Sequence, residues 1–174
     1  SLAGTLLNSF SLDEHNGFLR VLTTDGTPWN QSDLSETRLT VFEEQGDGLV
    51  PIGDVGGLGQ GEALYSARLI GDRGFAVTFR QVDPFYVLDL SDPTAPRVSG
   101  ELKIPGFSTY LHPVGEHRVL GVGRAATEEG RVTGLKLSLF EVADPSNPVE
   151  LSTWTMDDAN SMAEYDHHAF QMIG

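Results

Sequence analysis

The 174-residue sequence contains no cysteine. It therefore cannot form a disulfide bond, hold a metal through thiolates or use a cysteine nucleophile. Lysine is nearly missing as well, since only Lys103 and Lys136 are present. A high-GC or salt-adapted source has this composition, and a solvated acidic surface accounts for it equally well. Neither absence fixes the compartment, because many exported bacterial proteins also lack cysteine.

Long apolar runs are also absent. No stretch approaches the roughly 18 consecutive apolar residues that a membrane-spanning helix needs. The opening residues SLAGTLLNSF lack the basic residue and the long apolar core of a signal peptide. The sequence therefore predicts no transmembrane segment, and any export signal is absent or has been removed.

Positive charge is scarce. The chain has 25 acidic and 11 basic residues, which gives a formal net charge of −14. Such a chain repels phosphate backbones and anionic lipid headgroups. Nucleic acid is therefore excluded as an expected partner, and protein, glycan or cation ligands remain.

Helical periodicity is the last missing feature, and residues 156–170 are its one candidate. Asp157 or Asp158 could cap one or two helical turns there, although a loop fits equally well. Elsewhere 20 glycines and 9 prolines separate short runs rich in Val, Leu, Phe and Tyr. This pattern is typical of many short strands joined by tight turns, so we expect an all-β fold.

The sequence contains an internal repeat. YVLDLSDPTAPRVSGEL (residues 86–102) and SLFEVADPSNPVELSTW (residues 138–154) share a strand followed by D-P-x-x-P, with the two aspartates 52 residues apart. A fainter copy, LTVFEEQGDGLVPIG (residues 39–53), has glycines in place of the prolines. Fixed-period similarity of this kind indicates a repeat architecture.

A second repeated feature precedes each copy. GDRGFAVTF (residues 71–79) matches GEHRVLGVG (residues 115–123) 44 residues later, and DEHNGFLRVL (residues 13–22) resembles both. Each unit of 44 to 52 residues then holds four antiparallel strands. This is the size and content of a β-propeller blade.

The repeated turn has a physical reason. Prolines at positions 93, 96, 145 and 148 fix φ and cannot donate to a strand ladder, so the chain must leave its third strand there. Asp92 and Asp144 can accept hydrogen bonds from backbone amides two residues on. The turn thus fixes the register of the strands on both sides of it.

These residues also carry a resemblance to a known family. FYVLDLSDPTAPRVSGELKIPGFSTYLHP (residues 85–113), GLKLSLFEVADPSNP (residues 134–148) and YDHHAF (residues 165–170) resemble a family of secreted bacterial and archaeal β-propeller proteins distantly related to WD40 repeats. The DLSDPTAP portion also resembles the LVIVD repeat of cell-surface propellers. The likeness runs from about residue 64 to residue 170.

The resemblance implies a secreted or cell-surface propeller of unestablished biochemical function, and it supplies no catalytic residues or cofactor. The expected organisation is a single partial propeller with blades at 1–62, 63–107 and 108–156 and an incomplete blade at 157–174. Propellers close with about four to eight blades. We therefore expect a fragment that is completed by the rest of a parent chain or by a second copy.

The blade topology predicts two rims and a central channel. Loops between the second and third strands, together with the crossovers to the next blade, share one rim and vary in length. The short hairpin and D-P-x-x-P turns share the other rim. Variable loops and the channel are the usual places for function, so candidate site residues are sought there.

The first strand of each blade lines the channel, and the 44-residue offset places Arg68 at the position of His112 in the next blade. Asp166, His167 and His168 are expected on the first strand of the fourth blade, and Arg80 lies in a variable loop. Such a ring could bind an anion, or His with Asp could hold a metal. The alternative is that these side chains bond to neighbouring blades and fill the channel.

Other candidates are weaker. Asp157, Asp158 and Glu164 could chelate calcium, but they lack the spacing of a calcium loop, and a solvated crossover is the simpler interpretation. Trp29 and Trp154 are expected to pack rather than bind sugar, and Trp29 is the better exposed candidate because it lies in a long polar loop.

Two function classes follow. The first is a non-catalytic extracellular binding or interaction scaffold, which is favoured because no catalytic set assembles from the sequence. The second is a metal-dependent propeller hydrolase that uses Asp166, His167 and His168 with His112, since propellers host many chemistries.

Overall fold

The computed structural model describes residues 2–27, 35–79, 83–127 and 129–172. Arg80 and Trp29 lie outside these residues. The described chain is almost entirely β-structure, with three separate four-stranded antiparallel sheets and a few short 3₁₀ turns. None of its helices is long and apolar enough to cross a membrane.

The first sheet, called blade 1 below, contains β1 (Leu12–His15), β2 (Phe18–Asp25), β3 (Glu36–Gln45) and β4 (Gly48–Leu58) in sequential order. The turn between β1 and β2 is Asn16-Gly17, and both residues have positive φ, 55° and 83°. That conformation matches the right-handed twist of the two strands and explains why Asn-Gly stands there.

Blade 2 contains β5 (Ala63–Ile70), β6 (Arg73–Phe79), β7 (Asp83–Asp89) and β8 (Arg97–Ile104). Blade 3 contains β9 (Phe107–Val114), β10 (Arg118–Ala126), β11 (Val132–Glu141) and β12 (Val149–Asp157). Each is a sequential antiparallel meander. The predicted all-β fold with three four-stranded antiparallel blades is confirmed.

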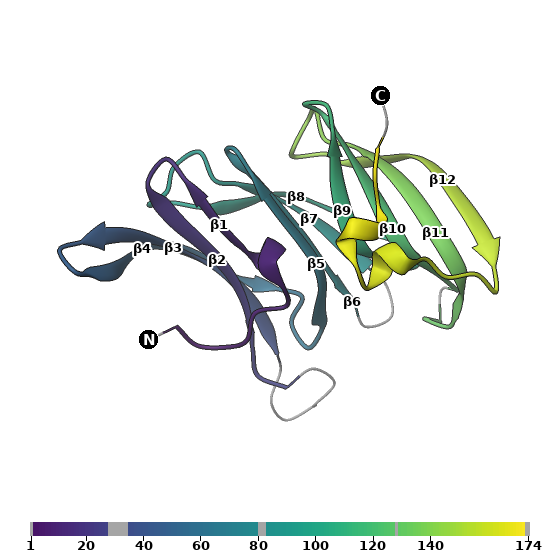
Figure 1. Cartoon of the computed structure of the whole chain (residues 1–174), viewed down its shortest axis with the longest axis horizontal. Helices are drawn as coiled ribbons and strands as arrows, with labels where there is room; N and C mark the ends of the chain where they lie inside the picture. The colour runs from purple at the N-terminus through teal and green to yellow at the C-terminus, as the bar shows by residue number, and fades with distance from the viewer. Residues whose placement is uncertain (1, 28–34, 80–82, 128, 173–174) are drawn as a thin grey trace.

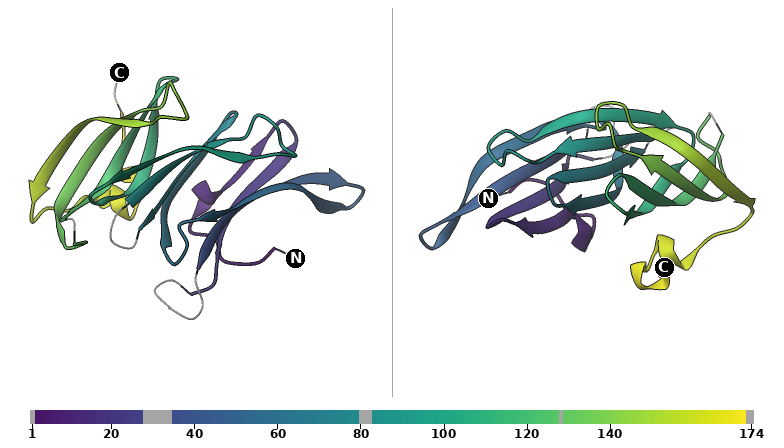
Figure 2. Two further views of the ribbon diagram at one scale, coloured as in Figure 1. Left: turned by 180° about the vertical axis from the view of Figure 1, so that it is seen from behind. Right: turned by 90° about the horizontal axis from the view of Figure 1, so that it is seen from above.

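The three sheets fan out side by side (Figure 1). The first strands β5 and β9 contact each other across the blade 2–blade 3 boundary, and β1 lies beside β5. Seen from above, the first strands gather on one side and β4, β8 and β12 lie along the opposite edge (Figure 2). The first strands therefore form the inner side of the fan, as in a propeller.

The D-P-x-x-P turns adopt the predicted geometry. Asp92 Oδ1 accepts hydrogen bonds from Thr94 N (2.9 Å) and Thr94 Oγ1 (2.7 Å), and Asp144 Oδ1 accepts the same pair from Ser146 (3.0 and 2.6 Å). These bonds favour the charged carboxylate and hold the pKa of both aspartates below its ordinary value. The two turns are the same structure repeated.

Each of these turns also docks on the preceding blade, which the sequence did not predict. A Cβ on Gly53 in β4 would lie 2.9 Å from Cδ of Pro96 and would clash with the Pro93 carbonyl oxygen. A Cβ on Gly100 in β8 would lie 2.8 Å from Cδ of Pro148 and would meet the Pro145 carbonyl in the same way. Glycine thus lets the proline turn of one blade seat on the outer strand of its neighbour.

Hydrogen bonds from arginine side chains to backbone carbonyls reinforce these contacts between blades. Buried Arg20 of blade 1 donates to the Gly71 carbonyl of blade 2 (2.5 Å) while it pairs with Asp13. Arg73 of blade 2 donates to the Val142 carbonyl of blade 3 (3.0 Å). Because these donors reach carbonyl oxygens of the next blade, they help to fix the angle between the sheets.

Two apolar cores lie between the blades rather than inside one sheet. The first joins side chains of blades 1 and 2, including Leu39, Val41, Leu69 and Leu88. The second joins blades 2 and 3, including Phe75, Phe85, Leu111 and Phe140. A single four-stranded sheet has no core of its own, so each blade is stabilised by its neighbours.

Residues 157–172 depart from the prediction of a fourth blade. The described residues there form two 3₁₀ turns, η2 (Met162–Glu164) and η3 (His167–Ala169), instead of a first strand that carries Tyr165 to His168. Ser161 caps η2, rather than Asp157 or Asp158, through a reciprocal bond with Glu164. No described strand forms a ladder with this segment. Local capping and single bonds to blade 3, from Asp158 N to Thr133 O (3.1 Å) and from Arg124 to Ala159 O (3.0 Å), hold its conformation.

Candidate functional site

Five side chains meet on the inner side of the fan, where β5 and β9 run side by side. Arg68 comes from β5, and Tyr110 and His112 come from β9. Phe10 belongs to η1 (Ser9–Ser11), whose cap residue Asn8 accepts a bond from Phe10 N (2.9 Å). Phe170 follows η3. We call this set the inner-strand cluster.

Arg68 lies over the Phe10 ring, with Cζ 4.5 Å from the ring centroid. The geometry is that of a cation–π contact, which holds the guanidinium in place without using its N–H donors. Within the described part of the chain, Arg68 has no carboxylate partner and no hydrogen-bond acceptor. Its side chain is half-buried, so the guanidinium remains reachable from solvent.

His112 lies beside this cation in an aromatic setting. Its Nδ1 is 3.3 Å from Tyr110 Oη, and its ring centroid is 5.0 Å from that of Phe170. Burial, followed by the positive charge of Arg68, lowers the pKa of His112 below its ordinary value of 6.5. His112 is therefore neutral at pH 7, and Arg68 carries the charge of the cluster.

The aromatic rings complete the cluster. Tyr110 has its ring centroid 5.9 Å from Phe10 and 5.4 Å from Phe170, with tilted rings in both cases. Phe10 and Phe170 come from opposite ends of the sequence, so the cluster ties both ends to the inner strands. It offers one cation, one neutral imidazole and the partly exposed rings of Phe10 and Phe170 to a ligand.

The other predicted site residues have different surroundings. Asp166 Oδ1 accepts a bond from His168 N (2.9 Å) and lies 3.1 Å from His168 Nδ1, and both side chains are largely exposed. His167 begins η3. Arg80 lies outside the described residues. The offset thus brought Arg68 and His112 together, whereas Asp166 and His168 form a local pair on a 3₁₀ turn.

The described residues contain no group of three or more His, Asp or Glu side chains that could hold a metal ion. In the predicted calcium set, Glu164 is already engaged, since its Oε1 accepts from Ser161 N (2.6 Å) and lies 3.5 Å from Arg124. Its side chain is only 3% exposed. The structure therefore offers no ligand set for a metal-dependent hydrolase among the described residues.

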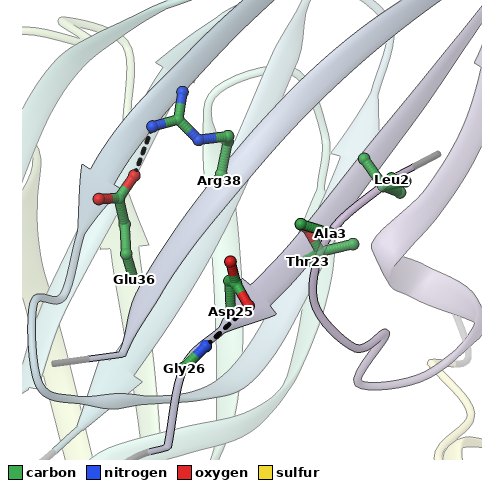
Figure 3. Close-up of a pocket in the computed structure, with 7 residues that line it drawn as sticks. All are labelled: Leu2, Ala3, Thr23, Asp25, Gly26, Glu36 and Arg38. Carbon is green, nitrogen blue, oxygen red and sulfur yellow. Dashed lines mark hydrogen bonds and ion pairs between the residues drawn. The ribbon is translucent and has the colours of Figure 1, made fainter. Parts of the chain in front are cut away.

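A hollow of about 370 Å³ lies on the variable rim of blade 1 (Figure 3). In its lining, Arg38 bonds to Glu36 (2.7 Å) and to Asp54, whereas Asp25 accepts from the backbone amide of Gly26 (2.9 Å). A second hollow, of about 500 Å³, lies between the hairpin turns of blades 2 and 3, and its Arg118 pairs with Glu141. The arginines of both hollows bond to oxygen acceptors, whereas Arg68 of the inner-strand cluster is held by an aromatic ring.

Sequence reasoning missed three members of the cluster. Tyr110 stands two residues before His112 on one strand, so strand alternation places both on the same face, and this signal was readable. Phe10 precedes and Phe170 follows the repeated sequence segments, which run from residue 13 to residue 154. Only the folded chain shows that η1 and the segment after η3 reach the inner strands.

Three meander sheets that pack face to face, with first strands inside and interlocking turns, define a β-propeller type of protein. The sequence matches the family described as "Beta propeller domain" over residues 1–173, and the chain belongs to this family.

Two relatives are similar over nearly the whole chain. An "Uncharacterized protein" of Archaeoglobus fulgidus is 49% identical over 170 residues, which are 98% of this chain and 25% of the relative. "Uncharacterized protein MJ1554" of Methanocaldococcus jannaschii is 41% identical over 169 residues, which are 97% of this chain and 26% of the relative. The chain thus spans about a quarter of the length of these relatives.

Proposed function

We propose that the chain is a non-catalytic binding scaffold that recognises an anionic group of its ligand at Arg68. The observation that carries this proposal is the unpaired guanidinium in the inner-strand cluster. Five other arginines of the described chain pair with carboxylates, namely Arg20, Arg38, Arg97, Arg118 and Arg124. In a chain with 25 acidic residues, an arginine held by an aromatic ring alone is kept available for an outside acceptor.

The surroundings support an anion with an apolar portion. Phe10 and Phe170 flank the cation with ring surface, and neutral His112 can donate or accept a hydrogen bond according to its tautomer. The net charge of −14 opposes non-specific anion binding, so a ligand must be recognised by local contacts. An extracellular location is part of the proposal and rests on the resemblance of the repeats to secreted propellers.

Titration with sodium citrate tests this proposal. We expect a saturable shift of the His112 ring and Arg68 Nε–H signals in NMR spectra at constant ionic strength, with sodium chloride producing none. The expected apparent Kd is about 1 mM, equivalent to about 4 kcal/mol. Arg68→Gln should weaken binding at least tenfold, and Arg68→Lys should retain part of it because the charge remains.

The pH dependence has a defined sign. Because the pKa of His112 is lowered below 6.5, its imidazolium forms as pH falls through that pKa, and sulfate should bind more tightly there. Sulfate replaces citrate in this experiment because its charge is constant in this range, whereas citrate takes up a proton. Arg97→Gln removes an exposed arginine that pairs with Asp89, and it is the matched control that should leave citrate binding unchanged. Equal citrate binding by Arg68→Gln and the unmodified chain would refute the proposal.

A further inference from the structure

Blades 2 and 3 can be compared position by position, because their strand registers match. Val87 pairs with Gly100 in blade 2, and Leu139 pairs with Ser152 in blade 3, each just before a register shift. By the same register Phe85 corresponds to Leu137, and Ile104 corresponds to Met156. These positions form the face of each sheet that points toward the next blade.

In blade 2 this face is covered by blade 3. Phe85 and Val87 are 0% exposed, and Ile104 is 7% exposed. In blade 3 the corresponding Leu137 and Leu139 are only partly buried, and Met156 is 48% exposed. All of these residues are apolar in both blades, although only blade 2 has a four-stranded sheet on that side. In blade 3 the C-terminal segment covers part of the face, where Ala163 and Phe170 pack with Val122 and Leu137.

Two further positions complete the comparison. Leu102 of blade 2 is partly buried against the blade 2–blade 3 core, and its counterpart Trp154 is 49% exposed. Buried Phe75 corresponds to Leu120, which is partly exposed. We call Leu120, Leu137, Leu139, Trp154 and Met156 the outer face of blade 3. A contiguous apolar patch of this kind marks an interaction surface.

We propose that the outer face of blade 3 is the docking surface for a further four-stranded blade of the same kind. The face continues the blade 1–blade 2 and blade 2–blade 3 interfaces, in which the same register positions are buried by the next sheet. The relatives have about three quarters of their length outside the matched region, which is room for such a blade.

A second copy of this chain is a poorer occupant. At each interface within the chain, the later blade buries the residue just after its third strand. This residue is Leu90 in blade 2 and Val142 in blade 3, which are 5% and 1% exposed. Blade 1 has exposed Glu44 at that position, and a glycine turn where the others have D-P-x-x-P. Docking blade 1 of another copy would bring a carboxylate into an apolar interface, which carries a desolvation cost.

Ser152 specifies one detail of the docked state. It stands where Gly53 and Gly100 admit a proline turn, and glycine is needed there because a Cβ would clash. The turn of the further blade must therefore sit farther from β12 than the turns of blades 2 and 3 sit from β4 and β8. Affinity is then expected to come mainly from the apolar side chains of the face.

Cysteine labelling tests this inference, since the chain has no cysteine of its own. Three single variants are compared: Leu139→Cys on the outer face, Thr153→Cys as an exposed control and Val87→Cys as a buried reference. Thr153 corresponds to Glu101, which stays exposed beside blade 3, so docking should leave it open. Each variant is measured in this chain alone and in the full-length Archaeoglobus fulgidus relative carrying this chain in place of its matching stretch.

In the chain alone, we expect a maleimide to label positions 139 and 153 at rates within tenfold of each other. In the full-length hybrid, labelling at position 139 should slow at least a hundredfold, while labelling at position 153 should not change. Protection at position 87 in both backgrounds reports that the blades are folded. If position 87 is labelled in the first hybrid, a second hybrid is made in which this chain replaces the matching stretch of the Methanocaldococcus jannaschii relative.

Two results would overturn the inference. Unchanged reactivity at position 139 in a hybrid with protected position 87 would mean that no further blade covers the face. Protection at position 139 that rises with the concentration of this chain alone would assign the face to a second copy. The citrate experiment can fail separately, because it uses this chain alone and reports on Arg68 of blade 2, although His112 shares a face of blade 3 with Leu120 and Leu139.

Discussion

Phe140→Ala is expected to lower the free energy of unfolding by about 3–5 kcal/mol, the usual cost of removing a buried aromatic side chain. Phe140 is 0% exposed and stacks on Phe85 of the neighbouring blade, with ring centroids 4.3 Å apart and planes 10° apart. The variant leaves a cavity in the apolar core that blades 2 and 3 share. Urea denaturation monitored by circular dichroism measures the loss.

Trp154→Ala is the matched control, because it also removes a large aromatic side chain from blade 3. Trp154 is half-exposed on β12, so its removal should cost less than about 1 kcal/mol in this chain. Equal losses for the two variants would mean that the interface between blades 2 and 3 does not hold the fold together.

Gly100→Ala is expected to cost about 1–3 kcal/mol, because it overpacks the blade 2–blade 3 interface. The added methyl group would meet the Pro145 carbonyl and lie 2.8 Å from Cδ of Pro148. Both belong to a turn fixed by two prolines, so neither can move aside easily. The same urea experiment measures the effect, and Gly53→Ala should behave alike because it repeats the contact with blade 2.

Gly48→Ala controls for the intrinsic effect of adding a methyl group to a strand. Nothing lies within 4 Å of a Cβ at Gly48, and its φ is not positive. The change should therefore be neutral or slightly stabilising. A loss at Gly48 as large as that at Gly100 would contradict docking of the proline turn.

The repeat predicted the blades because its signals are local. Prolines and glycines end strands wherever they stand, and the alternation of apolar residues assigns faces without knowledge of the partner sheet. The contact of each proline turn with a glycine of the preceding blade could not be predicted from the sequence in the same way. Gly53 and Gly100 are ordinary strand glycines in the sequence, and only the packed sheets show what a Cβ there would strike.

The candidate site was predicted in part for the same reason. Arg68 and His112 occupy one repeat position on neighbouring first strands, so the repeat offset placed them together. The strand expected at Asp166 and His168 was wrong, because this stretch forms the 3₁₀ turn η3, and their role in ligand binding stays a prediction. Phe10 joins the cluster through a tertiary contact with Arg68, which the period of the sequence repeat does not predict.

Trp154 shows a further limit of reading the sequence. It was expected to pack, and its register position is indeed a packing position, but the described chain leaves it half-exposed. A sequence pattern can state that a face is built for a neighbour. It cannot state whether the neighbour is present.

The central claim is that successive blades dock by seating a proline turn on a strand glycine of the blade before. Nuclear Overhauser contacts in the 18.8 kDa chain test it directly. The account predicts contacts from Gly53 Hα to the Hδ protons of Pro96, and from Gly100 Hα to those of Pro148. Contacts of either glycine with some other segment, in place of these, would contradict the account.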